Sequence, residues 1–346
     1  MTETVERPDG PPDPVQHLFQ IATGYIFSIA LYLVADAGVA DHLGSGPRPV
    51  ADLARATGKN EDALYRFMRL LASVGIFSEV APRTFALTPA AQLLQKKHPE
   101  SLRDMMVFIN DPFHFRVYAD LDESLKTGRP AAEKTVGMPV FKYFEQNPGY
   151  SEIFNRAMTA MSAVAIPAAL EAYDFSGIGV LVDVAGGHGE VLMSILRKHP
   201  GMRGILMDVD HVIAGAKPRF AAAGVADRVQ TASGDFFKAV PDGGDAYIMK
   251  HIIHDWDDER ATLILKNIHS ALGGKRNGKV ILLESVIPPG NEPGMAKIAD
   301  IEMMALPGGR ERTAEEFRAL FAGAGFRMTS ITPTKSPFCV IEASRT

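Results

Sequence analysis

The residues best suited to chemistry stand together at positions 250–256, where the chain reads KHIIHDW. An apolar run at 246–249 precedes them and an acidic run at 257–259 follows, which is typical of a strand that gives way to a helix. His251 and His254 are imidazoles, which exchange protons near neutral pH, and strand ends border the ligand crevice of an open α/β sheet. The segment could therefore transfer protons. The alternative is that one histidine packs as structure and the acids only cap a helix.

Short apolar strands must position this segment. The pattern predicts strands at 180–184, 204–207, 229–232, 246–249 and 280–284, and helical segments alternate with them. This alternation is typical of a parallel, doubly wound α/β sheet. We therefore predict a Rossmann-like domain over residues 174–346, with KHIIHDW at the end of its fourth strand.

A glycine-rich turn, DVAGGHGE at 183–190, follows the first predicted strand. Glycines at a strand-to-helix turn let a ligand approach the backbone and the helix amides closely, which makes Gly186, Gly187 and Gly189 candidate binding residues. The dinucleotide pattern GxGxxG is not met, because counting from Gly187 its third glycine position is Leu192. NAD is therefore disfavoured.

Acidic and aromatic residues follow the next two strands. Asp208 ends the second strand about 20 residues after the glycine turn, where an acid can bind ribose hydroxyls. Asp235 and Phe236 follow the third strand and suit the amine and the flat face of an adenine. Together with the glycine turn, these residues predict a nucleoside-containing cofactor.

The N-terminal part follows a different pattern. Residues 1–14 are acidic and proline-rich, lack the features of a signal peptide and are predicted to be a disordered tail. Residues 15–98 predict one or two helices at 16–43, helices at 50–57, 61–73 and from 89, and a hairpin at 76–87, which is the order of a winged helix. Residues 51–75 carry four basic and three acidic side chains, so the basic face that DNA requires is missing. Dimerisation is the favoured role.

Composition narrows the class of protein further. The chain has 346 residues, 46% of them hydrophobic, and a net charge of −5, which argues against broad binding to nucleic acid or anionic membranes. The only cysteine, Cys339, excludes a disulfide framework and suits the cytoplasm. The apolar stretch 21–39 is interrupted by polar residues and is predicted to be too short to span a membrane. Residues 99–173 are helical, rich in methionine and aromatic residues, and are predicted to wall an apolar pocket.

Six motifs in order resemble the S-adenosylmethionine-dependent O-methyltransferases of the caffeic acid and hydroxyindole type. They are DVAGGHG at 183–189, MDVDHVI at 207–213, GDFF at 234–237, KHIIHDW at 250–256, LLES at 282–285 and PGGRERT at 307–313. The resemblance covers nearly the whole chain and implies a bacterial, dimeric, metal-independent enzyme that methylates a hydroxyl of a small aromatic acceptor. Two positions depart from the family pattern. Ala185 replaces the usual first loop glycine, and Val209-Asp210 replaces leucine-proline.

The resemblance also assigns catalytic roles. His254 would be the general base for a phenol, whose reference pKa is near 10, and His251 would be structural. Glu284 and Glu311 would orient His254 and stabilise the imidazolium. Placement at a strand end favours Glu284 of the two, whereas Glu311 rests mainly on the resemblance.

Cofactor and acceptor residues follow from the same comparison. Asp255 would lie near the methyl-donor end of the cofactor, Lys250 near its adenine end and Ser162 close by. The residues assigned to the acceptor pocket are Met158, Met303, Met304 and Trp256, the last beside the methyl donor. Two alternatives stay open: a same-fold enzyme that has lost methyl transfer and performs hydroxylation or decarboxylation, and a winged-helix regulator that senses the cofactor.

Overall fold

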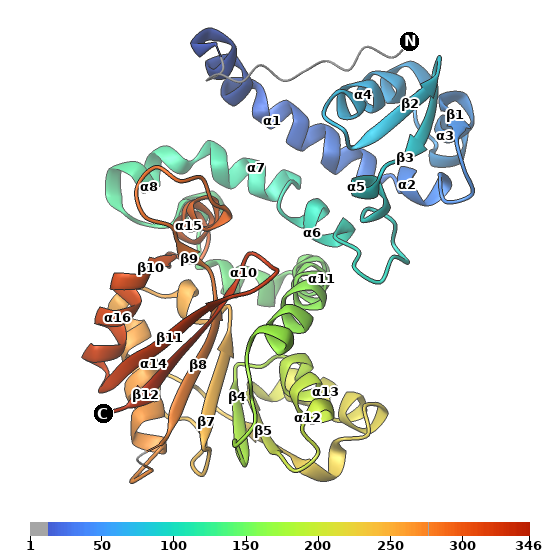
Figure 1. Cartoon of the computed structure of the whole chain (residues 1–346). Coiled ribbons are helices and arrows are strands. Elements are labelled where there is room, and N and C mark those ends of the chain that lie inside the picture. The colour runs from blue at the N-terminus through green and yellow to red at the C-terminus, as the bar shows by residue number, and fades with distance from the viewer. Residues whose placement is uncertain (1–12, 276) are drawn as a thin grey trace. The chain divides into compact units, whose positions relative to one another are not determined.

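The computed structural model describes residues 13–275 and 277–346, which divide into two compact units between His114 and Phe115 (Figure 1). Most of the predicted tail, residues 1–12, lies outside the described residues. Asp13 accepts a hydrogen bond from the amide of Gln16 and caps helix α1 (Pro14–Asp36). The last two residues assigned to the tail are therefore part of a helix start, because aspartate and proline favour those two positions.

The first unit has the predicted winged-helix order. After α1 come α2 (Val39–His42), α3 (Val50–Thr57) and α4 (Glu61–Ser73), then the hairpin β2 (Phe77–Ala81) and β3 (Thr84–Leu87), followed by α5 (Pro89–Gln92) and α6 (Arg103–Phe108). Leu64, Met68 and Leu71 bury one face of α4 at helical spacing. A short strand, β1 (Arg48–Pro49), pairs antiparallel with β3 and was not predicted.

Helix α1 exposes a broad apolar surface within the first unit. Leu18, Phe19, Ile21 and Tyr25 are each more than half exposed. By length and composition alone, α1 and α11 (Pro148–Ala172) could each cross a membrane. The sequence analysis predicts that the apolar stretch 21–39 is too short to span a membrane. By length this prediction is wrong, because the helix that contains most of the stretch, α1, has 23 residues. A helix that packs against a partner subunit has the same composition.

The second unit is built on a seven-stranded sheet of order β11-β12-β8-β7-β4-β5-β6. The strands are β4 (Val180–Val184), β5 (Arg203–Asp208), β6 (Val229–Ser233), β7 (Ala246–Lys250), β8 (Lys279–Glu284), β11 (Phe326–Pro333) and β12 (Cys339–Arg345). All five predicted strands are present. The sheet is mixed rather than wholly parallel, because β12 runs antiparallel to both β8 and β11. The short connection 334–338 permits only the antiparallel direction between β11 and β12.

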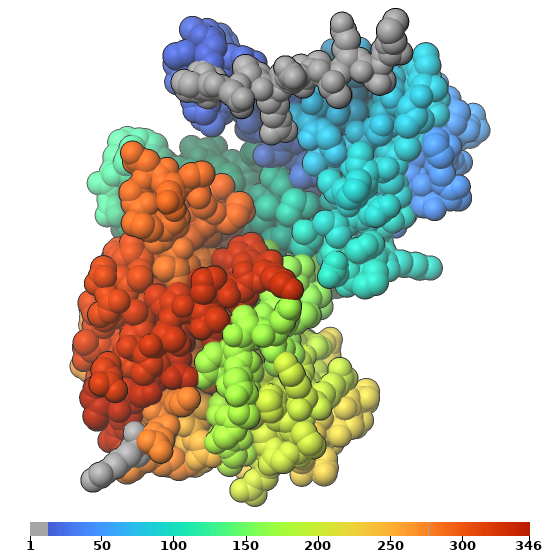
Figure 2. Space-filling view, in the orientation of Figure 1, coloured from blue at the N-terminus to red at the C-terminus, as the bar shows by residue number. Residues whose placement is uncertain are grey.

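Helices cover both faces of this sheet (Figure 1). One core lies under α11, α12 (Glu190–Lys198) and α13 (Asp210–Ala222), and the other lies under α14 (Asp258–Ala271) and α16 (Ala314–Gly323). Burial on both sides explains the continuous apolar sequence of the central strands. The C-terminal segment, red in Figure 2, meets the green end of α11, where Lys335 pairs with Glu171 at 2.6 Å.

A separate two-stranded pairing lies beyond the carboxyl end of β8. Strand β9 (Val286–Ile287) follows β8 directly and pairs parallel with β10 (Arg312–Thr313). This pairing brings the segments that carry Glu284 and Glu311 side by side. The other helices of the unit are α8 (Leu121–Thr127), α9 (Ala131–Val136), α10 (Val140–Gln146) and α15 (Met295–Ala305), and α7 (Pro112–Ala119) spans the division between the units.

Candidate active site

The KHIIHDW segment lies where β7 ends, next to the end of β8. The two strands are parallel, and Lys250 pairs in register with Leu283, so their carboxyl ends lie at the same edge. One 3-10 turn, η2 (Ile253–Asp255), separates β7 from α14. Asp257 then caps α14 by accepting from the amide of Arg260. His254 is therefore held on a tight turn between two regular elements.

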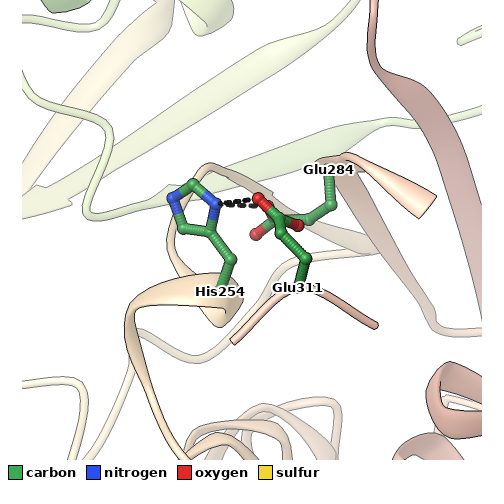
Figure 3. Close-up of side chains that lie close together, drawn as sticks. All are labelled: His254, Glu284 and Glu311. Carbon is green, nitrogen blue, oxygen red and sulfur yellow. Dashed lines mark hydrogen bonds and ion pairs between the residues drawn. The ribbon is translucent and has the colours of Figure 1, made fainter. Parts of the chain in front are cut away.

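His254 faces two buried carboxylates. Its Nδ1 lies 2.9 Å from Oε1 of Glu311 and 3.5 Å from Oε2 of Glu284 (Figure 3). The side chains of Glu284 and Glu311 are 0% and 1% exposed, and that of His254 is 14% exposed. The direct hydrogen bond is thus made by Glu311, and not by Glu284, which strand-end placement favours. The β9–β10 pairing decides this, and linear spacing does not reveal it.

Glu284 has a different position in the site. Its Oε1 accepts hydrogen bonds from the amides of Ile252 and Ile253, at 3.1 and 2.9 Å. These amides begin the turn that carries His254. Glu284 therefore fixes the backbone of the turn, whereas Glu311 fixes the imidazole ring itself.

The carboxylates control the charge of the imidazole. Burial alone would lower the pKa of His254, but the Glu284, Glu311 and Asp255 carboxylates outweigh burial and raise that pKa to about 10. Burial raises the pKa of Glu284 to about 7 and that of Asp255 to about 6. Asp255 lies on the other side of the ring, with Oδ1 3.6 Å from Nε2. The cluster strongly favours a protonated imidazole, the form that results from accepting a substrate proton.

His251 packs against the ring of His254. Its ring stacks on that of His254, with centroids 5.3 Å apart and planes inclined by 26°, and it also contacts Phe338 at 4.2 Å. Burial, together with the charges of Lys250 and His254, lowers the pKa of His251 well below its usual range. It is one of three described non-glycine residues with a positive φ, at 54°. A neutral ring on a strained backbone thus supports one side of the imidazole.

The glycine turn closes over β4 and β5. A Cβ at Gly186 would lie 2.4 Å from Cγ of Asp183, so no side chain fits there. The amide of Gly187 donates to Oδ2 of Asp208 at 2.8 Å, and Gly189 caps α12. Burial raises the pKa of Asp208, although its backbone hydrogen bonds oppose the shift. The predicted glycines and Asp208 form one connected edge.

Ala185 sits in this turn at a φ of 54°. Sequence reasoning expects the alanine to have little effect, because a methyl group is small and the cofactor contact would be made by the backbone. The positive φ nevertheless makes alanine less favourable than glycine here, because a β-carbon disfavours the left-handed region.

Asp183 is a buried acid that the sequence analysis did not select. It is 1% exposed, its Oδ2 has no hydrogen-bond partner within residues 13–275 and 277–346, and burial raises its pKa to about 7. Burial lowers the pKa of Lys250, which the charge of Asp183 opposes. An acid inside an otherwise apolar strand was the available signal. Asp183 lies against Gly186 of the glycine turn, and it is close enough to Lys250 for each to influence the pKa of the other.

Trp256 lies with the residues assigned to adenine. Its ring centroid is 6.1 Å from Phe236 and 4.8 Å from Phe237, and Phe141 approaches it at 6.4 Å. Its indole Nε1 is buried and has no hydrogen-bond partner in the described part of the chain. Asp235 is exposed and accepts from the amide of Phe237 at 3.0 Å. These contacts join the residues assigned to adenine with Phe141 of α10.

The three methionines predicted for the acceptor pocket come from α11 and α15, and Ser162, predicted to lie near the cofactor, is also on α11. Met158 and Ser162 lie one turn apart on α11, where the Ser162 hydroxyl donates to the carbonyl of Met158 at 2.8 Å. Met303 and Met304 lie in the last turn of α15, and the carbonyl of Met303 accepts from the amides of Gly308 and Gly309. Met303 is thereby tied to the loop that carries Glu311.

Asp300 is another residue that sequence reasoning missed. It lies on α15 and its Oδ1 accepts from the amide of Glu311 at 2.9 Å. Burial raises the pKa of Asp300, and the hydrogen bond from Glu311 opposes the shift. The acid lies eleven positions before its partner, across a helix end and a loop, a spacing with no periodic signal.

The arrangement fits S-adenosylmethionine. No atom beyond its chain neighbours lies within 4 Å of the place where a Cβ at Gly187 would stand, which leaves room for a ligand against the turn. Asp208 offers acceptor oxygens for ribose, and the indole N–H of Trp256, which has no partner among the described residues, lies beside Phe236. The fold and the site together define a class I methyltransferase, with His254 and its two carboxylates beyond the fourth strand of the sheet unit in chain order.

The chain belongs to the O-methyltransferase family. The model of the O-methyltransferase domain matches residues 118–327 and that of the O-methyltransferase dimerisation domain matches residues 19–97. Phenazine O-methyltransferase PhzM of Lysobacter antibioticus is 40% identical over 326 residues, 94% of this chain and 95% of that protein. The 3-amino-4-hydroxybenzoate 4-O-methyltransferase of Streptomyces cremeus is 37% identical over 92% and 86% of the two chains. The protein is an S-adenosylmethionine-dependent O-methyltransferase.

A solved structure supports the same assignment. CalO1, a methyltransferase in calicheamicin biosynthesis in its SAH-bound form, superimposes with a TM-score of 0.88 at 34% identity, covering 97% of this chain and all of that one. The expected fold, with a methyltransferase sheet and a separate N-terminal dimerisation domain, is thereby confirmed.

Proposed function

We propose that the enzyme methylates a hydroxyl of a small phenolic or polyketide-like acceptor, with His254 as its general base. The observation that carries this proposal is the 2.9 Å contact between Nδ1 of His254 and Oε1 of Glu311. If Nδ1 keeps its proton for Glu311, Nε2 is the nitrogen free to accept the proton of the acceptor hydroxyl.

Methyl transfer requires that the acceptor hydroxyl lose its proton and that the group accepting the proton stay aligned. S-adenosylmethionine supplies an electrophilic methyl group on a sulfonium. Nε2 of His254 accepts the hydroxyl proton as the acceptor oxygen becomes the nucleophile, and Glu311 stabilises the resulting imidazolium. Glu284 keeps the turn in place through two backbone amides, so that the nitrogen stays aligned.

The cofactor would lie along the carboxyl ends of β4 to β7. Gly186, Gly187 and Gly189 would contact it through the backbone, Asp208 would bind ribose, and Phe236 with Asp235 would bind adenine. In the same proposal Lys250, Asp255 and Ser162 lie near the cofactor, and Trp256 is shared between adenine and the acceptor.

The acceptor class follows from the apolar residues around the base. Met158, Met303 and Met304 offer adaptable surfaces for a flat ring. The relatives named above are described as acting on a phenazine and on an aminohydroxybenzoate, both aromatic. We further propose a cytoplasmic homodimer formed through the N-terminal unit, with no nucleic acid or membrane partner. The exposed face of α1 and the matched dimerisation domain support the dimer.

The His254, Glu284 and Glu311 cluster also has the composition of a metal site, since its potential ligand atoms lie within 4.8 Å of one another. A metal on Nδ1 would have to displace the hydrogen bond to Glu311. We propose metal-independent catalysis, for which dialysis against EDTA leaves the rate unchanged. A rate that is lost and then restored by one divalent ion contradicts this.

The test is His254→Ala, assayed with a panel of phenols. The loss of a general base is expected to lower kcat by about 10²–10⁴-fold and to leave cofactor affinity, measured by calorimetry, close to that of the wild type. Near-normal turnover would contradict the base assignment. Mass spectrometry of the product separates methyl transfer from hydroxylation or decarboxylation, and a gel-shift titration with genomic fragments tests the regulator alternative.

A further inference from the structure

We propose that Arg312 is a positioning residue, which fixes the turn that carries His254 relative to the loop that carries Glu311. This inference rests on the proposed function, because it assigns Arg312 a task only if the pairing of His254 with Glu311 is catalytic. Arg312 is 0% exposed and lies one residue after Glu311, at the start of β10.

The guanidinium of Arg312 uses all of its donors. Nε and Nη2 each donate to Oδ1 of Asp258, at 2.9 and 2.8 Å. Nη1 donates to the carbonyls of Ile253 and Arg310, at 3.1 and 3.3 Å, and Nη2 also donates to the carbonyl of Trp256 at 2.9 Å. A guanidinium has five N–H donors in a rigid plane, and here five contacts meet them. Lysine could satisfy at most three.

The positions of these acceptors carry the argument. The carbonyls of Ile253 and Trp256 lie immediately before and after the pair His254 and Asp255. Arg312 therefore donates hydrogen bonds to the turn on both sides of His254 and Asp255, and it also binds Asp258 in the first turn of α14. A purely structural arginine would have no reason to bracket this pair of residues.

The loop that holds Arg312 contacts the same turn through its backbone. The amide of Arg310 donates to the carbonyl of His254 at 2.8 Å. A Cβ at Gly309 would lie 2.0 Å from that carbonyl oxygen, so only glycine permits the approach. Arg312 thus completes a set of contacts between the two segments, and its loss would free the turn to move relative to Glu311.

The experiment compares Arg312→Ala and Arg312→Lys with a matched control, Arg228→Ala. Arg228 donates to the carbonyls of Leu196, His199 and Met202 at the end of α12 and touches no proposed site residue. For each variant we would measure kcat, acceptor KM and the pH dependence of kcat. A titration with S-adenosylhomocysteine would give the cofactor affinity, and its stoichiometry would count the folded sites.

We expect Arg312→Ala to lower kcat per folded site by about 100-fold, the effect of a displacement of roughly 1 Å, with cofactor affinity within about threefold of the wild type. Arg312→Lys should lose about tenfold, and millimolar guanidinium should partly restore Arg312→Ala but have no effect on Arg228→Ala. His254 faces Glu284, Glu311 and Asp255, with His251 stacked on it. The ascending limb of the kcat profile should therefore move to lower pH when the ring leaves Glu311.

Two results would overturn the proposal. One is a kcat per folded site that is unchanged in Arg312→Ala, with an unchanged pH profile. The other is an equal loss in Arg228→Ala, which would point to general destabilisation. If Arg312→Ala does not fold, Asp258→Asn, at a partner that is 58% exposed, gives the same test with an expected loss of about threefold. An active His254→Ala enzyme would instead refute the proposed base.

Discussion

Two parts of the carboxyl edge of the sheet, the cofactor edge at β4 and β5 and the base edge at β7 and β8, are built in different ways. At the cofactor edge, a glycine turn and Asp208 come from a stretch of 26 residues, 183–208, and the main contact is a backbone amide to a half-buried carboxylate. At the base edge, His254, Glu284 and Glu311 come from three separate segments and meet with almost no exposure. The first edge is shaped by the backbone and the second by paired buried charges. Changes at the second should cost more, because each removal leaves a buried partner unpaired.

The largest effects are expected at the base edge, where substituting each glutamate in turn separates their roles. Glu311→Gln removes the charge bonded to Nδ1 of His254 and is expected to lower kcat by about 100-fold. Glu284→Gln keeps an oxygen for the amides of Ile252 and Ile253 and should lower kcat by less than about tenfold. Initial rates at saturating substrates, with thermal melts as the control, distinguish them. Equal losses would show that both act on the imidazole.

The pH dependence of kcat tests the charge at the base edge. His254 must be neutral to accept a proton, and its pKa is raised to about 10. The rate should therefore climb by up to about tenfold per pH unit from pH 7 toward pH 9. Stability should move the opposite way. The raised pKa contributes stability that is fully present below the unfolded value near 6.5 and is lost as pH rises through the folded value.

Phenols of different acidity serve as the control for this profile. If the limb belongs to His254, its midpoint stays constant across acceptors and moves to lower pH in Glu311→Gln, where one carboxylate is missing. A midpoint that follows the pKa of the acceptor would instead show that the phenol ionises without the histidine.

Substitutions at the cofactor edge should change the affinity for the cofactor and leave kcat nearly unchanged. Asp208→Ala removes the acceptor for the Gly187 amide and for the proposed ribose contact, and is expected to weaken cofactor binding by about tenfold with kcat at saturation nearly unchanged. Calorimetry measures the affinity. Asp227→Ala, an exposed carboxylate before β6 at the opposite edge of the sheet, is the matched control. Unchanged affinity in Asp208→Ala would remove the ribose assignment.

The smallest expected effect lies at Ala185. Glycine tolerates its φ of 54°, so Ala185→Gly should increase the free energy of unfolding by up to about 1 kcal/mol, partly offset by the greater freedom of glycine in the unfolded chain. Denaturant unfolding measures the change. A clear destabilisation would mean that the methyl group packs usefully in the turn.

The sequence predicted what is local. The helices at 50–57 and 61–73 and the strand at 180–184 have the predicted bounds, because apolar spacing and capping residues act within a few positions. The cofactor edge was predictable for the same reason, since its turn and its acids each follow a strand directly.

The base edge was predictable only in part. The partner of His254 depends on the β9–β10 pairing, and the roles of Asp300 and Arg312 depend on loops that approach from far along the chain. The mixed sheet escaped prediction because the pattern at 326–345 does not show where a late hairpin inserts. Asp183 was overlooked because a buried charge in a strand has no periodicity.

The position of β12 has a consequence for synthesis. Residues 339–345 form an internal strand, and Cys339 pairs in register with Glu284. Until these residues leave the ribosome, the edge of β8 has no neighbour on that side, and the acid at its end lacks the packing that buries it. We therefore expect the sheet unit to complete its fold only after β12 is translated. A ribosome stalled before residue 339 should hold a chain that is sensitive to protease around β8.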